Sequence, residues 1–468
     1  MVFSSTLFLF IFLPIVLLIY YMIPQKYVMA KNVELLIASL LFYAWGERIY
    51  VGLMIISICV NYIFGLLLEL FEKRKQRLAV LVISIIFNLG MLFFFKYINF
   101  FTNNAFPSIV LPIGISFFTF QIMSYTIDVY WGNVKTQRNI FNLGLYISLF
   151  PQLIAGPIVR YIDVEREIQN RTYTVESVYR GVTRFTIGLA KKVVISNTVA
   201  LLADTIFAFP ANGMSAATAW LGAIAYTLQI YFDFSGYSDM AIGMGKMLGF
   251  NFLENFNYPY ISRSVQEFWR RWHMSLSTWF KDYLYIPLGG NRKGKIRTYI
   301  NLIIVFACTG FWHGAAWNFL VWGLYHGFFQ ILERLGLKKV LEKIPRVFGH
   351  IYTILVFIIG WVLFRAESLK YAWEYVKTMF SFNKWGWLNA VAQLDGDTYP
   401  GTYTLAILVL GIILSLPIVP TLAKKIENSR GGETAITIIR GVGMIVLLGY
   451  SILCLTGSDY NPFIYFRF

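Results

Sequence analysis

Long apolar runs alternate with short polar connectors along almost the whole chain. A helix needs about 20 apolar residues to cross the roughly 30 Å hydrocarbon core of a bilayer. We therefore expect roughly ten to twelve membrane segments, in an all-α polytopic membrane protein with a bundle of about 11 transmembrane helices. The apolar runs lie at 3–23, 33–45, 49–70, 78–101, 109–131, 140–158, 181–209, 216–232, 299–331, 350–364, 403–423 and 434–456. The first run lacks a basic region before it and a small-residue cleavage site after it, so we expect a retained helix.

The charges of the connectors predict how the segments are oriented. Connectors rich in lysine and arginine stay on the cytoplasmic side of a membrane. The connectors 102–108 and 389–402 carry little positive charge, and we expect them to face outward. The basic connectors, which we expect to be cytoplasmic, are 73–77, 135–138, 160–192, 263–297, 334–346 and 424–430.

Two apolar runs, 140–158 and 299–331, have basic connectors at both ends. A single crossing would place one of those connectors outside, so each run should begin and end on the cytoplasmic side. Pro151 interrupts the first run, and Gly310 and Gly314 lie in the middle of the second. Irregular backbone at membrane depth is tolerated only where protein or a water-filled cavity surrounds it. We therefore predict that both runs enter and return, as hairpins or re-entrant segments.

His313 lies near the centre of the 299–331 run, at the predicted tip of its hairpin. An ionisable group is costly in hydrocarbon and usually faces an internal cavity on a substrate or proton path. An imidazole with a pKa near neutrality can remove a proton from a hydroxyl group, and Gly314 beside it would let a ligand approach closely. The alternative is a structural histidine bonded to a buried carbonyl, which is also our interpretation of His326 and His350.

Composition narrows the class of protein. Hydrophobic residues make up 57% of the chain, charged residues 14%, and the mean hydropathy is +0.61, which leaves too little charge to cover a soluble domain. The net charge is +16, but the basic residues lie between apolar runs, so we expect them to face anionic membrane lipids and expect no nucleic-acid partner. The three cysteines lie in apolar runs and form no zinc-ligand pattern, so no metal is expected.

The segment 267–280 combines arginine, tryptophan and His273. As one helix it would be either an interfacial amphipathic helix or a wall of a tunnel open to the cytoplasm. In the second case Arg270, Arg271 and Lys281 would meet an anionic donor. One side of this helix would carry Trp269, Arg270, His273, Leu276, Ser277 and Phe280.

The connector 287–297 is rich in glycine and basic residues, with Arg292 and Lys293 at its centre. Glycines allow the backbone to approach a ligand closely, and the cations could hold phosphate. The order of residues differs from a Walker A motif, so we do not expect a nucleotide-binding P-loop.

Asp233 and Asp239 adjoin an apolar helix and need partners there. They would either orient a histidine or line a hydrophilic pore, or pair with Lys246 or Arg263 for structural reasons. No G-x-S-x-G motif is present, which disfavours a self-contained esterase.

Taken together, these segments resemble the membrane-bound O-acyltransferase family, and more closely its bacterial alginate and peptidoglycan O-acetyltransferase branch. The motifs are Tyr-Phe-Asp-Phe-Ser-Gly-Tyr-Ser-Asp-Met-Ala at 231–241, Phe-Trp-Arg-Arg-Trp-His-Met-Ser-Leu-Ser-Thr-Trp at 268–279, Leu-Gly-Gly-Asn-Arg-Lys-Gly at 288–294 and Trp-His-Gly-Ala-Ala-Trp-Asn-Phe at 312–319. Shorter similarities at 2–5, 151–157, 361–365 and 463–468 extend the resemblance over nearly the whole chain.

The resemblance implies one integral-membrane domain over 1–468, with a core at about 110–365 and peripheral helices at 1–101 and 403–457, around a central tunnel. It implies a catalytic histidine at His313 and a second one at His273. Candidate residues lining the tunnel are Trp272, Trp312, Asn318, Asp233 and Asp239.

The function it implies is transfer of an acetyl group from cytoplasmic acetyl-CoA, a donor substrate rather than a resident cofactor. The acceptor would be a hydroxyl of an extracytoplasmic polysaccharide, or a partner transferase of the SGNH hydrolase type, outside the inner membrane of a bacterium. His313 would act as general base, and His273 would position or polarise the thioester carbonyl. Arg270, Arg271, Lys281, Arg292 and Lys293 would contact the phosphates of the donor.

This interpretation requires the imidazole of His313 to be open to a thioester on one side and an alcohol on the other. Two alternatives remain: a D-alanyl transferase that uses a carrier-protein thioester, and a transporter or flippase.

Overall fold

A computed structural model describes residues 2–107, 109–154, 156–381, 401–429, 432–457 and 460–464. Within those ranges the protein consists of helices and loops and has no β-strand. Most of the connector 389–402 and of the motif 463–468 lies outside the described residues.

The helices of the first part of the chain follow the apolar runs closely. Their bounds are η1 Phe8–Phe12, α1 Leu13–Met22, α2 Val28–Gly46, α3 Tyr50–Leu70, α4 Arg74–Leu92, η2 Phe93–Tyr97, α5 Ile98–Phe101, α6 Ile115–Trp131, α7 Ile140–Ser148, α8 Phe150–Leu153, α9 Tyr161–Gln169 and α10 Val175–Ala190.

The second part contains the segments that resemble the acyltransferases. Its helices are η3 Lys191–Ser196, α11 Asn197–Phe207, η4 Ala211–Gly213, α12 Ala216–Met247, η5 Pro259–Ile261, α13 Val265–Trp269, α14 Met274–Phe280, η6 Lys281–Tyr285, α15 Lys295–His313, α16 Trp317–Leu332, η7 Glu333–Leu337, α17 Lys338–Lys343, α18 Arg346–Arg365, α19 Leu369–Met379, α21 Thr402–Leu414, α22 Ile418–Glu427 and α23 Gly432–Thr456.

These elements form two compact units, each assembled from segments that are distant in sequence. The first unit comprises Met1–Thr186, Tyr237–Glu254 and Lys281–Tyr283. The second comprises Ile187–Gly236, Asn255–Phe280 and Leu284–Phe468.

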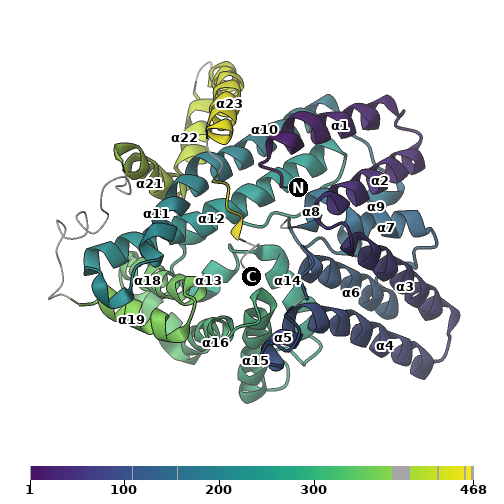
Figure 1. Cartoon of the computed structure of the whole chain (residues 1–468), viewed down its shortest axis with the longest axis horizontal. Helices are drawn as coiled ribbons and strands as arrows, with labels where there is room; N and C mark the ends of the chain where they lie inside the picture. Colours follow the sequence, from purple (N-terminus) through teal and green to yellow (C-terminus); the bar gives the residue numbers. More distant parts are fainter. Residues whose placement is uncertain are drawn as a thin grey trace. The chain divides into compact units, whose positions relative to one another are not determined.

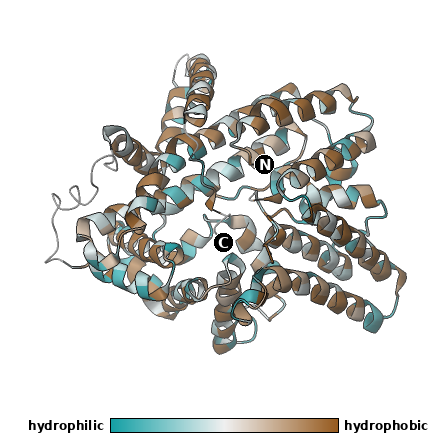
Figure 2. Cartoon of the chain, in the orientation of Figure 1, coloured by the Kyte–Doolittle hydropathy of each residue, from teal (hydrophilic) through white to brown (hydrophobic). Residues whose placement is uncertain are grey.

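The first unit presents apolar side chains on its outer surface. Ile56 on α3 is 56% exposed and Ile86 on α4 is 65% exposed, which suits contact with lipid rather than water. Figure 2 shows hydrophobic residues along most of α3 and α4 and hydrophilic residues where α4 begins. The surface therefore fits a membrane protein.

The run 140–158 is interrupted, as predicted, because α7 ends at Ser148 and the short α8 covers only Phe150–Leu153. The basic segment 160–192 differs from prediction. It is mostly helical, in α9 and α10, because its charges occur at helical spacing between apolar residues rather than as a continuous polar stretch.

The run 299–331 forms the predicted hairpin in the second unit. Helices α15 and α16 pack along each other (Figure 1), and α15 ends at His313, directly before the break. Their close approach depends on small residues. A Cβ atom added at Gly310 would lie 2.3 Å from the carbonyl oxygen of Phe319, and one at Gly323 would lie 2.2 Å from that of Phe306.

Six helices among the described residues are long and apolar enough to cross a membrane, or seven if the bent pair α21 and α22 counts as one span. The protein is therefore a multi-pass membrane protein. The expected count of about 11 is not reached by this measure, because helices such as α1 and α16 are shorter than a full span.

Candidate active site

His313 lies at the tip of the α15–α16 hairpin, as predicted, and is 8% exposed. Three aromatic rings surround its imidazole edge to face. The ring centroids of Trp312, Trp322 and Phe364 lie 4.9, 5.1 and 5.2 Å from that of His313. The helix break places the imidazole among side chains from α15, α16 and α18, and these aromatic rings leave little of it exposed.

The role expected for Gly314 is wrong. A Cβ atom at this position would lie 2.2 Å from the ring of Phe319, so the space beside Gly314 is filled by the protein itself. The glycine lets the Phe319 ring pack against the hairpin turn and does not provide access for a ligand.

The segment 267–280 is not one helix. Helix α13 ends at Trp269, α14 begins at Met274, and His273 lies in the break with a left-handed backbone, φ 43°. The amphipathic spacing that predicted a continuous helix does not account for this turn. Strained conformations of non-glycine residues cost about 1–3 kcal/mol and are concentrated at functional sites.

The side chain of Asn255 fixes the imidazole of His273. Its Oδ1 atom accepts hydrogen bonds from the backbone N–H (3.2 Å) and the hydroxyl (2.9 Å) of Ser275, so the orientation of the amide is determined. The same oxygen lies 3.2 Å from Nδ1 of His273. Nδ1 must therefore carry the proton in the neutral ring, and Nε2 is left as an acceptor.

Nε2 of His273 is buried and has no hydrogen-bond partner among the described residues. Burial, and then the charge of the neighbouring His313, hold the pKa of His273 well below its ordinary range. His273 is therefore a neutral imidazole with an unused basic nitrogen.

Trp312 connects the two histidines. Its indole lies 5.9 Å from the imidazole of His273 and 4.9 Å from that of His313, measured between ring centroids. The sequence-predicted pair His273 and His313 is thus brought together, 40 residues apart in sequence, around one aromatic ring. Asn318 does not point toward them, since its amide donates a hydrogen bond of 3.0 Å to the carbonyl of Ala366.

A small cavity, which we call the His313 cavity, adjoins the imidazole of His313. Its volume is about 10 Å³, roughly the space of one water molecule. Among the described residues this cavity is too small to hold a thioester, which would reach His313 through it only if its walls moved. Those walls are Ile230, Phe234, Trp272, His313, Trp322, Trp361, Phe364 and Ile464.

The two aspartates have partners other than those expected. Asp233 forms a fully buried ion pair of 2.7 Å with Lys192, a residue of η3 rather than of a cytoplasmic loop. Asp239, in the first unit, pairs with Arg184 at 2.7 Å. Neither Lys246 nor Arg263 takes this role, because the partners come from elements that sequence spacing alone does not bring together.

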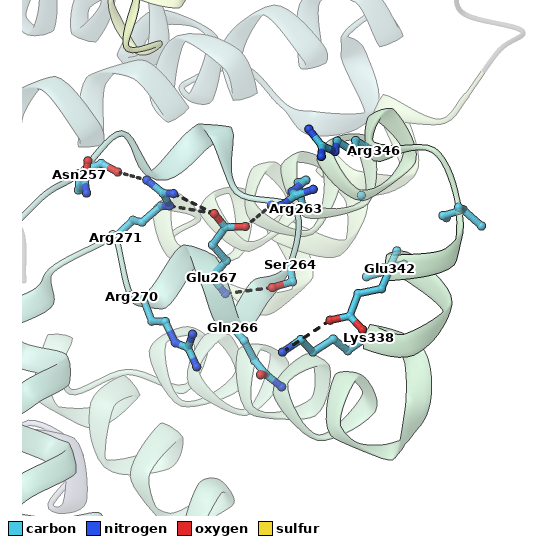
Figure 3. Close-up of a pocket in the computed structure, with 13 residues that line it drawn as sticks. Asn257, Arg263, Ser264, Gln266, Glu267, Arg270, Arg271, Lys338, Glu342 and Arg346 are labelled. Atoms are coloured by element: carbon cyan, nitrogen blue, oxygen red, sulfur yellow. Dashed lines mark hydrogen bonds and ion pairs between the residues drawn. The ribbon is translucent and has the colours of Figure 1, made fainter. Parts of the chain in front are cut away.

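Figure 3 shows a second and larger cavity in the same unit, which we call the arginine pocket. Its volume is about 670 Å³, and five cations and two carboxylates line it. Arg271 is occupied there, since it pairs with Glu267 at 3.0 Å and donates to the carbonyl of Asn257. The lining residues are Asn257, Arg263, Ser264, Gln266, Glu267, Arg270, Arg271, Lys338, Leu341, Glu342, Ile344, Arg346 and Gly349.

Three guanidinium groups remain available in the arginine pocket. Arg263, Arg270 and Arg346 line it and have no ion-pair partner within the part of the chain that the structure describes. Such groups suit phosphate, which accepts paired hydrogen bonds from a guanidinium.

The other predicted donor contacts lie elsewhere. Arg292 and Lys293 are exposed in the turn before α15 and do not line the arginine pocket. Lys281 belongs to the first unit, where it lies 3.8 Å from Asp282.

Two residues that the sequence analysis missed shape the site. Asn255 fixes His273, and Glu333 accepts hydrogen bonds from the backbone N–H groups of Val265 (2.5 Å) and Gln266 (3.0 Å), which begin α13. The available signal for Glu333 was a carboxylate just after the apolar run 299–331, and no local pattern identified Asn255. The described residues contain no group of three or more His, Cys, Asp or Glu side chains placed to hold a metal ion.

Comparison with known proteins gives one consistent family. Residues 132–371 match the membrane-bound O-acyltransferase family. The chain is 42% identical to a probable alginate O-acetylase of Pseudomonas putida and 39% identical to that of Azotobacter vinelandii, in both cases over 100% of each chain. It is 37% identical to a peptidoglycan O-acetyltransferase of Helicobacter pylori, over 82% of this chain and 80% of the relative.

A teichoic acid D-alanyltransferase of Bacillus subtilis is 31% identical over 46% of this chain and 56% of its own length. The O-acetyltransferases therefore match over far more of the chain, and they identify a membrane O-acetyltransferase rather than a transporter. The two histidines, the hairpin and the arginine pocket all fall within or next to the matched residues. The chain belongs to the membrane-bound O-acyltransferase family and is an acyltransferase enzyme.

Proposed function

We propose that the protein transfers the acetyl group of cytoplasmic acetyl-CoA to a hydroxyl group outside the inner membrane of a bacterium. The observation that carries the proposal is the pair of buried histidines beside Trp312, one of them at the tip of a hairpin inside the matched region. An imidazole at such a place can take a proton from a hydroxyl, and a dry site holds the reactants in one orientation.

In the proposed reaction His313 is the general base. The acceptor oxygen attacks the thioester carbonyl as His313 removes its proton, so that a C–O bond forms and the C–S bond breaks. The proton then passes from the imidazolium to the departing sulfur, which leaves as the free thiol of CoA. A base of this kind contributes about 10²–10⁴-fold to the rate.

Of the two roles expected for His273, positioning fits the geometry and polarising the carbonyl does not. A neutral ring that donates from Nδ1 to Asn255 offers only a lone pair at Nε2. Such a nitrogen can hold a hydroxyl or amide hydrogen of a substrate. It cannot donate to a carbonyl oxygen.

The arginine pocket is the proposed place for the phosphates of the donor. Arg270, the expected contact that remains available, is joined there by Arg263 and Arg346. Arg270 also lies in the same break as His273, so one short segment would contribute to both ends of the donor site.

The proposed acceptor is a polysaccharide of the cell surface. The relatives that match the whole chain are named for alginate, and another is named for peptidoglycan. We propose that an extracytoplasmic transferase of the SGNH hydrolase type completes the transfer.

Washed membranes containing the protein test the donor. We expect label from acetyl-CoA to reach an extracytoplasmic acceptor, and D-alanyl carrier protein to donate nothing. The reverse result would move the protein to the D-alanyl transferases.

The phosphate site is tested with Arg346→Ala in the same membranes. Loss of a guanidinium that binds phosphate should raise KM for acetyl-CoA about tenfold, with little change in kcat, since a hydrogen bond to a charged group contributes about 1.5–3 kcal/mol. Arg334→Ala is the matched control, because Arg334 is exposed nearby in the chain but does not line the pocket. Equal KM values in the two variants would refute the assignment.

A further inference from the structure

One wall of the His313 cavity differs from the others in how it is held. The remaining walls come from α12, α15, α16, α18 and the break before α14, and most of them are aromatic. Ile464 instead belongs to the short segment 460–464, which lies outside the helices named above and is drawn as the yellow trace after α23 in Figure 1. Its side chain is 3% exposed.

Buried polar contacts fix Ile464 in this place. The carboxylate of Asp233 accepts a hydrogen bond of 2.9 Å from the backbone N–H of Ile464. Lys192, the partner of Asp233, donates to the backbone carbonyl of Pro462. Asp233 and Lys192 therefore bind the segment 460–464 as well as each other.

Further contacts hold the start of the segment against α11. The hydroxyl of Tyr460 donates to Asp204 at 2.6 Å, and the amide of Asn197 donates to Asn461 at 3.2 Å. Removing one partner of a buried ion pair costs about 3–5 kcal/mol, because it leaves an uncompensated charge in the protein interior. The Ile464 side chain is therefore a firmly placed wall beside the imidazole.

We propose that the His313 cavity receives the methyl group of the acetyl donor and that Ile464 limits the length of the acyl chain. The inference rests on the proposed function, because it takes acetyl-CoA as the donor. A cavity of about 10 Å³ must already expand to admit an acetyl group. A longer chain would have to displace Ile464, which Asp233 holds by its backbone.

Ile464→Ala tests the proposal, since it removes every side-chain carbon beyond Cβ and leaves the backbone bond to Asp233 in place. Transfer from acetyl-CoA and from propionyl-CoA is compared in washed membranes. One methylene in an apolar pocket changes selectivity by roughly 10–200-fold, so we expect the preference of the wild type for acetyl to fall by about tenfold or more. Ile195→Ala is the control, because Ile195 is 5% exposed in the same unit and does not line the cavity.

Ile230→Ala provides a second enlargement of the same cavity from α12, in case the first variant fails to fold. An unchanged acetyl-to-propionyl ratio in a folded cavity variant would overturn the inference and leave the proposed function standing. Failure of the wild type to transfer acetyl from acetyl-CoA would instead refute the proposed function itself.

Discussion

At the scale of single residues, a hydrogen bond decides what His273 can do. The backbone N–H of Ser275 fixes the amide of Asn255, and that amide fixes the tautomer of His273. Residue type and setting singled out His273 and His313, and the structure places both beside Trp312. The tautomer could not be predicted, because Asn255 lies 18 residues before His273 and no periodic pattern connects them.

The neutral state of His273 has a consequence for stability. Its pKa in the folded protein is well below the value of about 6.5 in an unfolded chain. Below that pH the unfolded chain gains a proton that the folded protein does not bind. Stability should therefore be lost as the pH falls from about 6.5 toward 5, by up to about 1.4 kcal/mol per pH unit.

The melting temperature of the detergent-solubilised protein between pH 5 and 8 measures this effect. His273→Asn should make the acid side of the curve less steep, and asparagine tolerates the left-handed backbone at this position. Ser275→Ala loses a hydrogen bond to the same Asn255 but changes no titrating group. It should lower the melting temperature at every pH and leave the slope on the acid side unchanged. Identical acid slopes in wild type and His273→Asn would contradict a neutral, buried His273.

At the scale of helices, the hairpin of α15 and α16 sets the position of His313. The basic connectors and central glycines predicted a chain reversal, and the structure confirms it. The same reasoning failed for the segment 267–280, because amphipathic spacing describes a helix but cannot detect a left-handed residue within it. Glu333, distant in sequence, accepts hydrogen bonds from the backbone at the start of α13.

Gly310→Ala tests the contact that holds the hairpin together. The new Cβ atom would meet a backbone oxygen of Phe319 that cannot rotate away, so the helices must separate. We expect a loss of about 1–3 kcal/mol in stability and a drop in acetyl transfer as His313 shifts. Gly441→Ala in α23, where nothing lies within 4 Å, should alter neither quantity, and a stable, active Gly310→Ala protein would contradict the close packing.

At the scale of the whole molecule, composition and apolar runs predicted an all-α membrane protein, and the helices and family confirm it. The number of crossings was harder to predict. An apolar run does not distinguish a segment buried within the protein from a segment that faces lipid. The run 299–331, for example, is longer than one span and yet forms two short helices, α15 and α16. The partners of Asp233 and Asp239 were also unpredictable, since they depend on which helices pack together.

Orientation can be tested by labelling cysteines in a variant that lacks Cys59, Cys308 and Cys454. The hairpin returns to the side it left, so cysteines at Lys295 and Arg334 should both react only from the cytoplasmic face. A cysteine at Thr102, in a connector expected to face outward, should react in intact cells. Labelling of Lys295 and Arg334 positions from opposite faces would show that this region crosses the membrane.

Acetyl transfer by His313→Ala measures the central claim most directly. Membranes with equal amounts of wild type, His313→Ala and the control His350→Ala receive acetyl-CoA labelled in the acetyl group. If His313 is the base, its loss should lower the rate of transfer to the extracytoplasmic acceptor by about 10²–10⁴-fold, while His350→Ala stays close to wild type. Undiminished transfer by a folded, membrane-inserted His313→Ala protein would show that the imidazole takes no part in the reaction.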